Sequence, residues 1–386
     1  MEKKCILYCK YIKNIRRYSL LYPILKKRRL SDQIYYMDIL APRTARSCQP
    51  GQFVIVKIDE AGERIPLTIC DYDRAQGTVA IVFQTVGAST KRMALLEEGD
   101  SFRDFAGPLG CPSELIHKTP EELRQMNLLF VAGGVGTAPV YPQVKWLHEQ
   151  GVKADCIIGA RNKSLVILEQ EMKQVAANLY VATDDGSYGF HGNVNDQIKE
   201  LVQNQGHTYD LVVAIGPLVM MKFVSILTKE LQIPTVVSMN PIMVDGTGMC
   251  GACRLSVGGE IKFACVDGPE FDGHLVDFDQ AIKRQAIYKT EEGRALLKLQ
   301  EGKTHHGGCG QCGDHEHNGN ATNDSIHNKT GKINTDNNAD IKNSSNSNGN
   351  TKNSPNSNDN IKNNSNSTCN ADNTIHNDAH NRKEAH

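Results

Sequence analysis

The stretch Leu128-Leu-Phe-Val-Ala-Gly133-Gly-Val-Gly136-Thr-Ala-Pro139 joins an apolar run to a glycine-rich turn and an amphipathic segment at 138–150. A buried strand that runs through glycines into a helix suits nucleotide binding, because the glycines let the backbone approach a pyrophosphate at the helix N-terminus. The pattern is not the full dinucleotide fingerprint, since Pro139 stands where the third glycine would be, and no lysine follows as in a P-loop. Alone, the stretch indicates either a phosphate-binding loop or an ordinary tight strand–helix turn.

The regions on either side of this stretch have different periodicities. Downstream, apolar runs alternate with amphipathic stretches, which predicts a parallel sheet with crossover helices over 123–239. Upstream, short runs punctuated by Pro and Gly predict an antiparallel β-barrel over 21–122. The apolar runs lie at 156–159, 179–182, 211–215 and 235–237 downstream, and at 34–39, 52–58, 67–69 and 79–83 upstream.

A cysteine motif follows the α/β region. Asp245-Gly-Thr-Gly-Met-Cys250-Gly-Ala-Cys253, with Cys265 beyond it, has the spacing D-x4-C-x2-C-x11-C. A plant-type [2Fe–2S] cluster uses C-x4-C-x2-C and a distant fourth cysteine, so Asp245 takes the first ligand position. We therefore predict a [2Fe–2S] segment with a C-terminal helix over 240–302. Zinc held by three thiolates and an oxygen is the alternative, followed by a merely reactive cysteine pair.

The two ends of the chain differ in composition from the rest. Residues 303–386 contain no Leu, Phe, Tyr or Trp and are rich in Asn and Ser, so we expect a disordered tail in which Cys309 and Cys312 are incidental. Residues 1–20 form a basic extension without the apolar core of a signal peptide. The net charge of −1 argues against bulk attraction to nucleic acid, and no stretch is apolar enough to span a membrane. Scattered cysteines without a secretion signal favour a cytoplasmic location.

Two short motifs in the barrel region carry groups that suit a nucleotide cofactor. Arg64-Ile-Pro-Leu-Thr68 places a guanidinium, which binds pyrophosphate bidentately, near a hydroxyl that can donate to a flavin nitrogen. Gly87-Ala-Ser89-Thr90 suits a phosphate cradle. The alternatives are a surface arginine and a strand threonine for the first motif, and a helix cap for the second.

In this order, the motifs resemble the ferredoxin–NADP reductase superfamily. Gly268-Pro-Glu-Phe-Asp-Gly-His-Leu-Val-Asp277 and the cysteine motif make the chain most similar to the small subunits of NADH-dependent reduced ferredoxin:NADP oxidoreductases, also called sulfide dehydrogenases. A more distant resemblance is to the electron-transfer subunit of dihydroorotate dehydrogenase. The superfamily more often has R-x-Y-[S/T], so Arg64 is displaced by one position and Leu67 replaces the aromatic residue.

The resemblance implies a role for each motif. FAD would be held by Arg64, Pro66, Leu67 and Thr68, with Thr68 at the reactive edge of the ring, and its pyrophosphate by Gly87, Ser89 and Thr90. The nicotinamide nucleotide would contact Gly133, Gly134, Gly136 and Thr137 at its pyrophosphate, Asp184 and Asp185 at its ribose, and Gly216 and Pro217 under the nicotinamide. The cluster ligands would be Asp245, Cys250, Cys253 and Cys265.

The expected function is an oxidoreductase subunit that moves electrons between NAD(P)H, FAD and a [2Fe–2S] cluster. The resemblance implies a larger flavin and iron–sulfur partner subunit, through which ferredoxin is reached indirectly. Asp184 and Asp185 would repel a 2′-phosphate and favour NAD(H), whereas Arg161 favours NADP(H). The alternatives are the electron-transfer subunit of a dihydroorotate dehydrogenase and a zinc-stabilised module without catalytic activity.

Overall fold

A computed structural model describes residues 21–300 of the chain. The expectations for the basic extension at 1–20 and for the Asn/Ser-rich tail at 303–386, including Cys309 and Cys312, concern residues outside this range.

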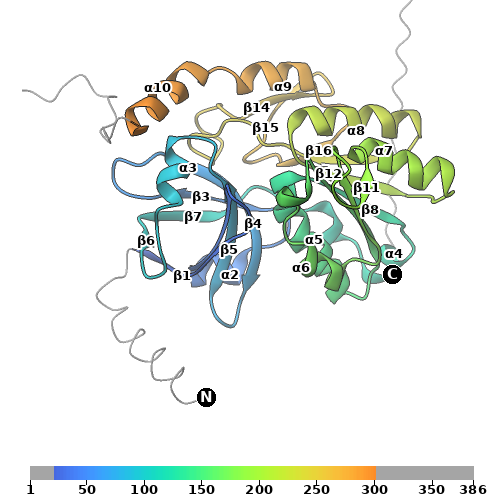
Figure 1. Ribbon diagram of the computed structural model, residues 1–386, viewed down its shortest axis with the longest axis horizontal. Helices are drawn as coiled ribbons and strands as arrows, with labels where there is room; N and C mark the ends of the chain where they lie inside the picture. The colour runs from blue at the N-terminus through green and yellow to red at the C-terminus, as the bar shows by residue number, and fades with distance from the viewer. Residues whose placement is uncertain (1–20, 301–386) are drawn as a thin grey trace, which may run out of the picture. The chain divides into compact units, whose positions relative to one another are not determined.

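The first part of the described chain is a sheet of seven antiparallel strands in the order β6-β1-β2-β5-β4-β3-β7 (Figure 1). Its two end strands, β6 and β7, are separated in sequence by Arg103 alone, so the sheet curls into a nearly closed barrel. The strands are β1 (Tyr22–Arg29), β2 (Ile34–Leu40), β3 (Phe53–Lys57), β4 (Ile65–Asp73), β5 (Thr78–Gln84), β6 (Ser101–Phe102) and β7 (Asp104–Leu109), with helices α2 (Pro42–Ser47) and α3 (Ala88–Met93) between them.

The second part is built on a seven-stranded sheet in the order β11-β10-β9-β8-β12-β13-β16. All neighbouring strands are parallel except β16, which pairs antiparallel with β13. The strands are β8 (Leu128–Gly133), β9 (Ala154–Ala160), β10 (Leu179–Thr183), β11 (Phe190–His191), β12 (Leu211–Ile215), β13 (Thr235–Ser238) and β16 (Glu270–Asp272). The helices are α4 (Pro120–Arg124), α5 (Thr137–Glu149), α6 (Glu169–Val175), α7 (Val194–Lys199) and α8 (Leu218–Glu230), with short turns η1 (Glu114–His117), η2 (Gly134–Gly136), η3 (Lys163–Leu165) and η4 (Glu200–Asn204).

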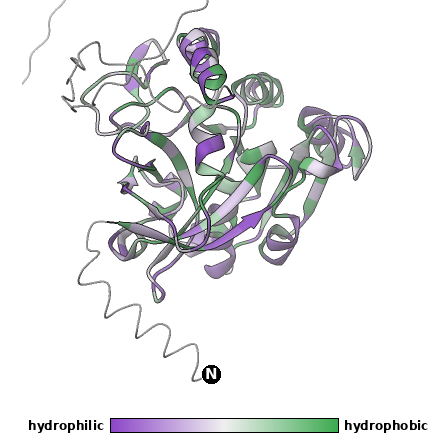
Figure 2. Cartoon of the chain, turned by 60° about the vertical axis from the view of Figure 1, so that its left-hand side comes forward, coloured by the Kyte–Doolittle hydropathy of each residue, from purple (hydrophilic) through white to green (hydrophobic). Residues whose placement is uncertain are grey.

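The apolar run that forms β8 supplies both faces of this sheet, because successive strand residues point to opposite sides. Leu129 and Val131 belong to the core cluster under α7 and α8, while Phe130 and Ala132 belong to the cluster under α5 and α6. Figure 2 shows hydrophilic and hydrophobic residues interleaved along the helices, as expected for helices that cover a sheet with one apolar face. The chain order reverses at β8, which lies between β9 and β12, so a crevice is expected at their carboxyl ends.

The segment predicted to hold the cluster, residues 240–302, has little regular secondary structure before residue 278. It contains the hairpin β14 (Arg254–Val257) and β15 (Glu260–Phe263), followed by α9 (Phe278–Gln285) and α10 (Lys289–Gln300). Strand β16 also comes from this segment, yet it completes the edge of the parallel sheet. The segment is therefore tied to the α/β part by backbone hydrogen bonds.

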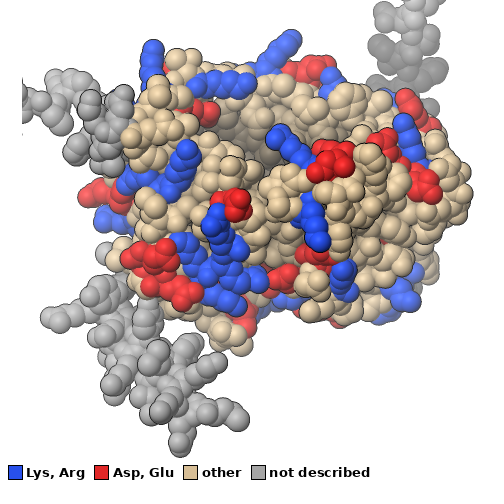
Figure 3. All heavy atoms as spheres, viewed as in Figure 1, with Lys and Arg blue, Asp and Glu red and all other residues tan. Residues whose placement is uncertain are grey.

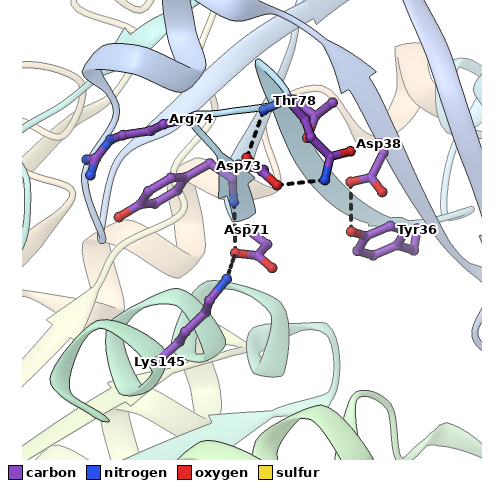
Figure 4. A pocket seen from close by; sticks show the side chains of 9 residues that line it. Tyr36, Asp38, Asp71, Asp73, Arg74, Thr78 and Lys145 are labelled. Atoms are coloured by element: carbon purple, nitrogen blue, oxygen red, sulfur yellow. Dashed lines mark hydrogen bonds and ion pairs between the residues drawn. The ribbon is translucent and has the colours of Figure 1, made fainter. Parts of the chain in front are cut away.

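The barrel and the α/β part share an apolar contact with a polar border. Ile34 and Val82 of the barrel belong to one core cluster with Ala138 of α5 and Leu168. At its edge, Lys145 Nζ donates to Asp71 Oδ1 at 2.7 Å (Figure 4). A polar hollow of about 460 Å³ lies beside this ion pair, and in its wall the Tyr36 hydroxyl donates to Asp38 at 2.8 Å. The hollow is lined by barrel residues and by Lys145 of α5, so it belongs to the contact between the barrel and the α/β part.

A second junction surrounds Glu270 at the start of β16. Gln143 of α5 donates its Nε2 to Glu270 Oε1 at 2.7 Å, and the Ser113 hydroxyl, which follows the barrel, donates to the same carboxylate. Burial raises the pKa of Glu270 to about 6, because the charged carboxylate is withdrawn from water. Three segments of the fold thus meet at one desolvated acid.

Figure 3 shows Lys and Arg interspersed with Asp and Glu on the face it presents. Among residues 21–300, no helix is long and apolar enough to cross a membrane.

We expect Glu270→Gln to change how stability depends on pH. The native state binds a proton at Glu270 more tightly than the unfolded chain, whose pKa is near 4.5, so the contribution of this residue to the free energy of unfolding falls as pH rises from about 4.5 through about 6. The variant carries no charge, and it should be more stable than wild type at pH 8 by about 1–2 kcal/mol. Urea unfolding at pH 5 and pH 8 measures this. Glu230→Gln, at an exposed position of α8, is the control, and an equal difference at both pH values would contradict the expectation.

Candidate functional site

A cavity of about 1060 Å³ lies where the barrel meets the carboxyl edge of the parallel sheet. It brings together residues that are far apart in the chain, from Ile34 of β2 to Pro269 directly before β16. Of the residues predicted to bind the two nucleotides, it is lined by Pro66, Leu67, Thr68, Gly133, Gly134, Gly136, Asp184, Gly216 and Pro217.

Two glycines of this cavity have no room for a side chain as the loops stand. A Cβ on Gly136 would lie 2.1 Å from the carbonyl oxygen of Ile215, and one on Gly133 would lie 2.3 Å from the Met220 sulfur. The Met220 side chain could move aside, but the Ile215 carbonyl is backbone, so the loops after β8 and β12 approach each other this closely only with glycine at 136. Thr137 stabilises this turn, because its side chain is fully buried and its hydroxyl donates to the Gly134 carbonyl at 2.9 Å. Its role is to hold the loop, and it does not line the cavity.

Thr68 presents a free hydroxyl to the cavity. It sits on β4 opposite Phe53 of β3, so its position is fixed by the ladder. Within residues 21–300 its hydroxyl has no protein hydrogen-bond partner. A donor with no protein partner that faces a cavity is available for a ligand.

Gly87, Ser89 and Thr90 lie outside the lining of this cavity, at the N-terminus of α3. The Gly87 N–H donates to the Thr90 hydroxyl at 3.0 Å, which is the helix-capping arrangement that the sequence left open. The Ser89 hydroxyl donates to the Glu63 carboxylate. A Cβ on Gly87 would meet nothing within 4 Å, so space remains beside this turn.

The two aspartates predicted at the ribose differ in position. Asp184 lines the cavity, whereas Asp185 accepts the Ser187 N–H at 2.9 Å and does not. Hydrogen bonds from Ser187 hold the pKa of Asp185 below its usual range. Arg161 also lines the cavity, as the sequence allowed.

Lys199 and Asn195 are lining residues that sequence reasoning missed. Both belong to α7, which begins at a capping box on Asn193. The Asn195 Oδ1 is buried and has no partner among the described residues, so the wall of the cavity offers an acceptor. The capping sequence Asn193-Val-Asn-Asp196 after Gly192 is the sequence signal that could have predicted the start of this helix.

The predicted cluster ligands fall into two pairs. Cys253 and Cys265 are buried with their sulfurs 3.3 Å apart, and burial raises the pKa of Cys265 to about 11. Cys250 is exposed and lies near Asp245, and the Ala252 N–H lowers the pKa of its thiol. Paired ligands suit a two-iron cluster with two ligands on each iron. Among the described residues, no three Cys, His, Asp or Glu side chains gather about one point.

The loop around these ligands is shaped by glycines with positive φ. Gly246, Gly248 and Gly251 have φ of +84°, +89° and +67°, values that L residues rarely adopt. The resulting turn directs backbone N–H groups to the ligands, since those of Thr247 and Met249 donate to the Asp245 carboxylate at 2.9 and 3.4 Å. The Thr247 hydroxyl is the largest contribution that lowers the pKa of Asp245, and the Arg64 charge adds to it.

Arg64 is placed away from the cavity that the rest of its motif lines. Its Nε donates to the Val244 carbonyl and its Nη2 to the Asp245 carbonyl, each at 3.0 Å. The guanidinium therefore contacts the cluster loop.

Comparison with known proteins matches both the cysteine segment and a larger part of the chain. Residues 240–277 match the family model of the iron–sulfur cluster binding domain of dihydroorotate dehydrogenase B. The chain is 44% identical over 269 residues to a dihydroorotate dehydrogenase B (NAD(+)) electron transfer subunit homolog of Thermotoga maritima, which covers 70% of this chain and 92% of the relative. It is 64% identical over 295 residues to an uncharacterized protein of Clostridium beijerinckii, covering 76% of this chain and all of that one.

A solved structure extends the likeness to three dimensions. A chain of the NADH-dependent reduced ferredoxin-NADP oxidoreductase, studied for flavin-based electron bifurcation, is 41% identical with a TM-score of 0.67. The match covers 72% of this chain and 98% of that chain. These comparisons confirm the expected fold class and the expected electron-transfer oxidoreductase subunit that uses FAD, an iron–sulfur cluster and NAD(P)H. They give no support to the zinc-stabilised module.

The matched region includes the barrel, the parallel sheet and the cysteine loop, and the relatives are matched over nearly their whole length. The chain belongs to the family of dihydroorotate dehydrogenase B electron-transfer subunits and their homologues.

Proposed function

We propose that this chain takes electrons from NADH and passes them through FAD and a [2Fe–2S] cluster to a larger flavin and iron–sulfur subunit. The observation that carries the proposal is the single cavity in which Thr68 of the barrel faces the glycine loops after β8 and β12. FAD supplies the ability to accept a hydride and release single electrons, which the cluster carries onward.

The chain's own groups bind and orient the two nucleotides. Thr68 donates its hydroxyl at the reactive edge of the flavin ring, and Pro66 and Leu67 pack beside it. The loop at 133–136, supported by Thr137, gives backbone N–H groups to the nucleotide pyrophosphate. Gly216 and Pro217 line the cavity and would lie under the nicotinamide ring. Gly87, Ser89 and Thr90 are proposed for the FAD pyrophosphate, which requires Glu63 to release the Ser89 hydroxyl.

The charges at the far end of the cavity support NADH as the nucleotide. Asp184 lines the cavity and accepts hydrogen bonds from ribose hydroxyls, while it repels a 2′-phosphate. Arg161 and Lys199 also line the cavity, and their positive charges would favour a 2′-phosphate. Asp184 carries the opposite charge and is therefore the residue that we assign to discrimination against NADPH. Asp185 does not line the cavity, and its Oδ1 accepts the Ser187 N–H, so we assign the discrimination to Asp184.

The cluster loop supports a partner that docks at its surface. Asp245, Cys250, Cys253 and Cys265 are the proposed ligands, with Cys250 exposed. Apolar side chains around the loop are exposed as well, Met249 by 87%. The others are Val244, Ile261 and Val266. An exposed apolar rim beside a redox centre suits a protein partner, which we propose to be the larger subunit, with ferredoxin reached through it.

A second candidate is delivery of electrons to a dihydroorotate-oxidising subunit. The name of the Thermotoga relative and the matched iron–sulfur family model favour it. The nicotinamide, flavin and cluster chemistry of this chain is the same in both cases, and the large subunit that co-purifies with the full chain distinguishes them.

We expect Asp184→Asn to weaken discrimination between the two nucleotides. Removal of the carboxylate takes away the repulsion of a 2′-phosphate, so NADPH should bind about tenfold more tightly, which is roughly 1.4 kcal/mol. NADH should bind with little change. Stopped-flow reduction of the flavin by each nucleotide over a range of concentrations gives both values. Asp185→Asn is the matched control and should leave the ratio unchanged. Wild type that reacts faster and more tightly with NADPH would overturn the assignment.

We expect the cluster to persist when Asp245 is replaced by another ligand residue, cysteine, and to become labile or absent when it is replaced by alanine. Asp245→Cys restores the plant-type spacing and should keep a [2Fe–2S] cluster with a shifted reduction potential. Asp245→Ala should give a labile or absent cluster, while the flavin content and its reduction by NADH are unchanged. Iron and sulfide analysis with redox titration measures these. Asp267→Ala is the control, and an Ala variant at 245 with unchanged cluster spectrum and potential would show that Asp245 is not a ligand.

A further inference from the structure

Arg64 joins the strand that faces the cavity to the loop that carries the first cluster ligand. It directly precedes β4, on which Pro66 and Thr68 lie. Its two donors reach two consecutive carbonyls, those of Val244 and Asp245, each at 3.0 Å. The rigid fork of a guanidinium can hold such a pair of acceptors, whereas a lysine ammonium offers no fixed geometry.

The same loop is seated on the barrel by a second contact. Gly246 is buried, and a Cβ there would lie 2.3 Å from Ile55 Cδ1 and 3.2 Å from Leu109 Cδ1. Ile55 stands directly opposite Pro66 in the β3–β4 ladder. The cluster loop and the flavin-facing threonine therefore rest on one pair of hydrogen-bonded strands.

We propose that Arg64 is a positioning residue for the iron–sulfur site, which fixes the loop from Val244 to Cys250 against the flavin-binding strand. This rests on the proposed function. It assigns the guanidinium to the cluster loop and not to the FAD pyrophosphate, since its Nε and Nη2 hydrogen bonds are directed to carbonyls of that loop.

Two consequences follow for the cluster. The loop is anchored to the β3–β4 ladder through Arg64 and Ile55, so its position relative to Thr68 would be set by that ladder. A positive charge bonded to the Asp245 backbone also lies beside the carboxylate of that residue, and positive charge favours the reduced, more negative state of a cluster. Loss of Arg64 should therefore loosen the loop and lower the reduction potential.

The test compares Arg64→Ala, Arg64→Lys and the control Arg103→Ala in the full chain. Arg103 is also a half-exposed barrel arginine, but within residues 21–300 its side chain pairs only with Glu60, at 3.5 Å. For Arg64→Ala we expect unchanged FAD content, unchanged flavin reduction by NADH, a lower cluster potential and about tenfold faster iron loss to a chelator, as for the loss of two hydrogen bonds. Arg64→Lys should keep the potential near wild type but release iron faster. Arg103→Ala should match wild type.

Each other outcome contradicts the inference. Loss of FAD from Arg64→Ala with an unchanged cluster would assign the residue to the flavin pyrophosphate. Unchanged iron loss and potential would remove any positioning role. If Arg64→Ala fails to fold, Arg64→Lys decides, because unchanged iron release in that variant also overturns the proposal. Wild type without FAD or cluster would refute the proposed function itself, before any variant is compared.

Discussion

The contact between Gly136 and the carbonyl of Ile215 is the constraint on which the site depends. A Cβ at that position would come within 2.1 Å of the carbonyl oxygen, so the turn after β8 and the end of β12 touch as bare backbone. This closeness places the loops at 133–136 and 216–217 side by side at the reversal point of the sheet. The barrel then closes the crevice through β4, whose Thr68 faces it. A side chain at Gly136 would push the loops apart and open the cavity.

One strand links the two redox sites in this arrangement. Arg64 at its start holds the cluster loop, and Thr68 lies four residues further along. At about 3.3 Å per residue, these two positions are roughly 13 Å apart along β4. The Glu270 junction fixes the other side of the cluster segment, because Gln143 of α5 and Ser113 after the barrel both donate to it. The cluster segment is thus held from the barrel and from the α/β part at once.

Patterns in the sequence predicted the elements whose signal is local. The apolar runs at 128–132 and 211–215 are strands, and the glycine turn between β8 and α5 lines the cavity. Strand β1 was not predicted, because Tyr22–Arg29 contains four basic residues and pairs where solvent reaches one face. Strands β6 and β16, of two and three residues, are too short for periodicity and exist only through pairing with distant partners.

The same limit applies to the site. The motif residues 66–68 and 133–136 do meet, but the positions of Arg64, Asp185 and Ser89 depend on partners that only the fold supplies, namely the Val244 carbonyl, Ser187 and Glu63. Lys199 lines the cavity because it belongs to α7, whose start is set by the N-cap residue Asn193. Apolar periodicity does not reveal where such a capped helix begins.

Anaerobic addition of NADH to the purified chain, followed by visible absorption and low-temperature EPR spectroscopy, tests the central claim most directly. The account predicts that the flavin absorption is bleached and that an EPR signal of a reduced [2Fe–2S] cluster appears without any partner protein. A colourless protein, or a flavin that is bleached while the cluster stays oxidised in the presence of excess NADH, would contradict it.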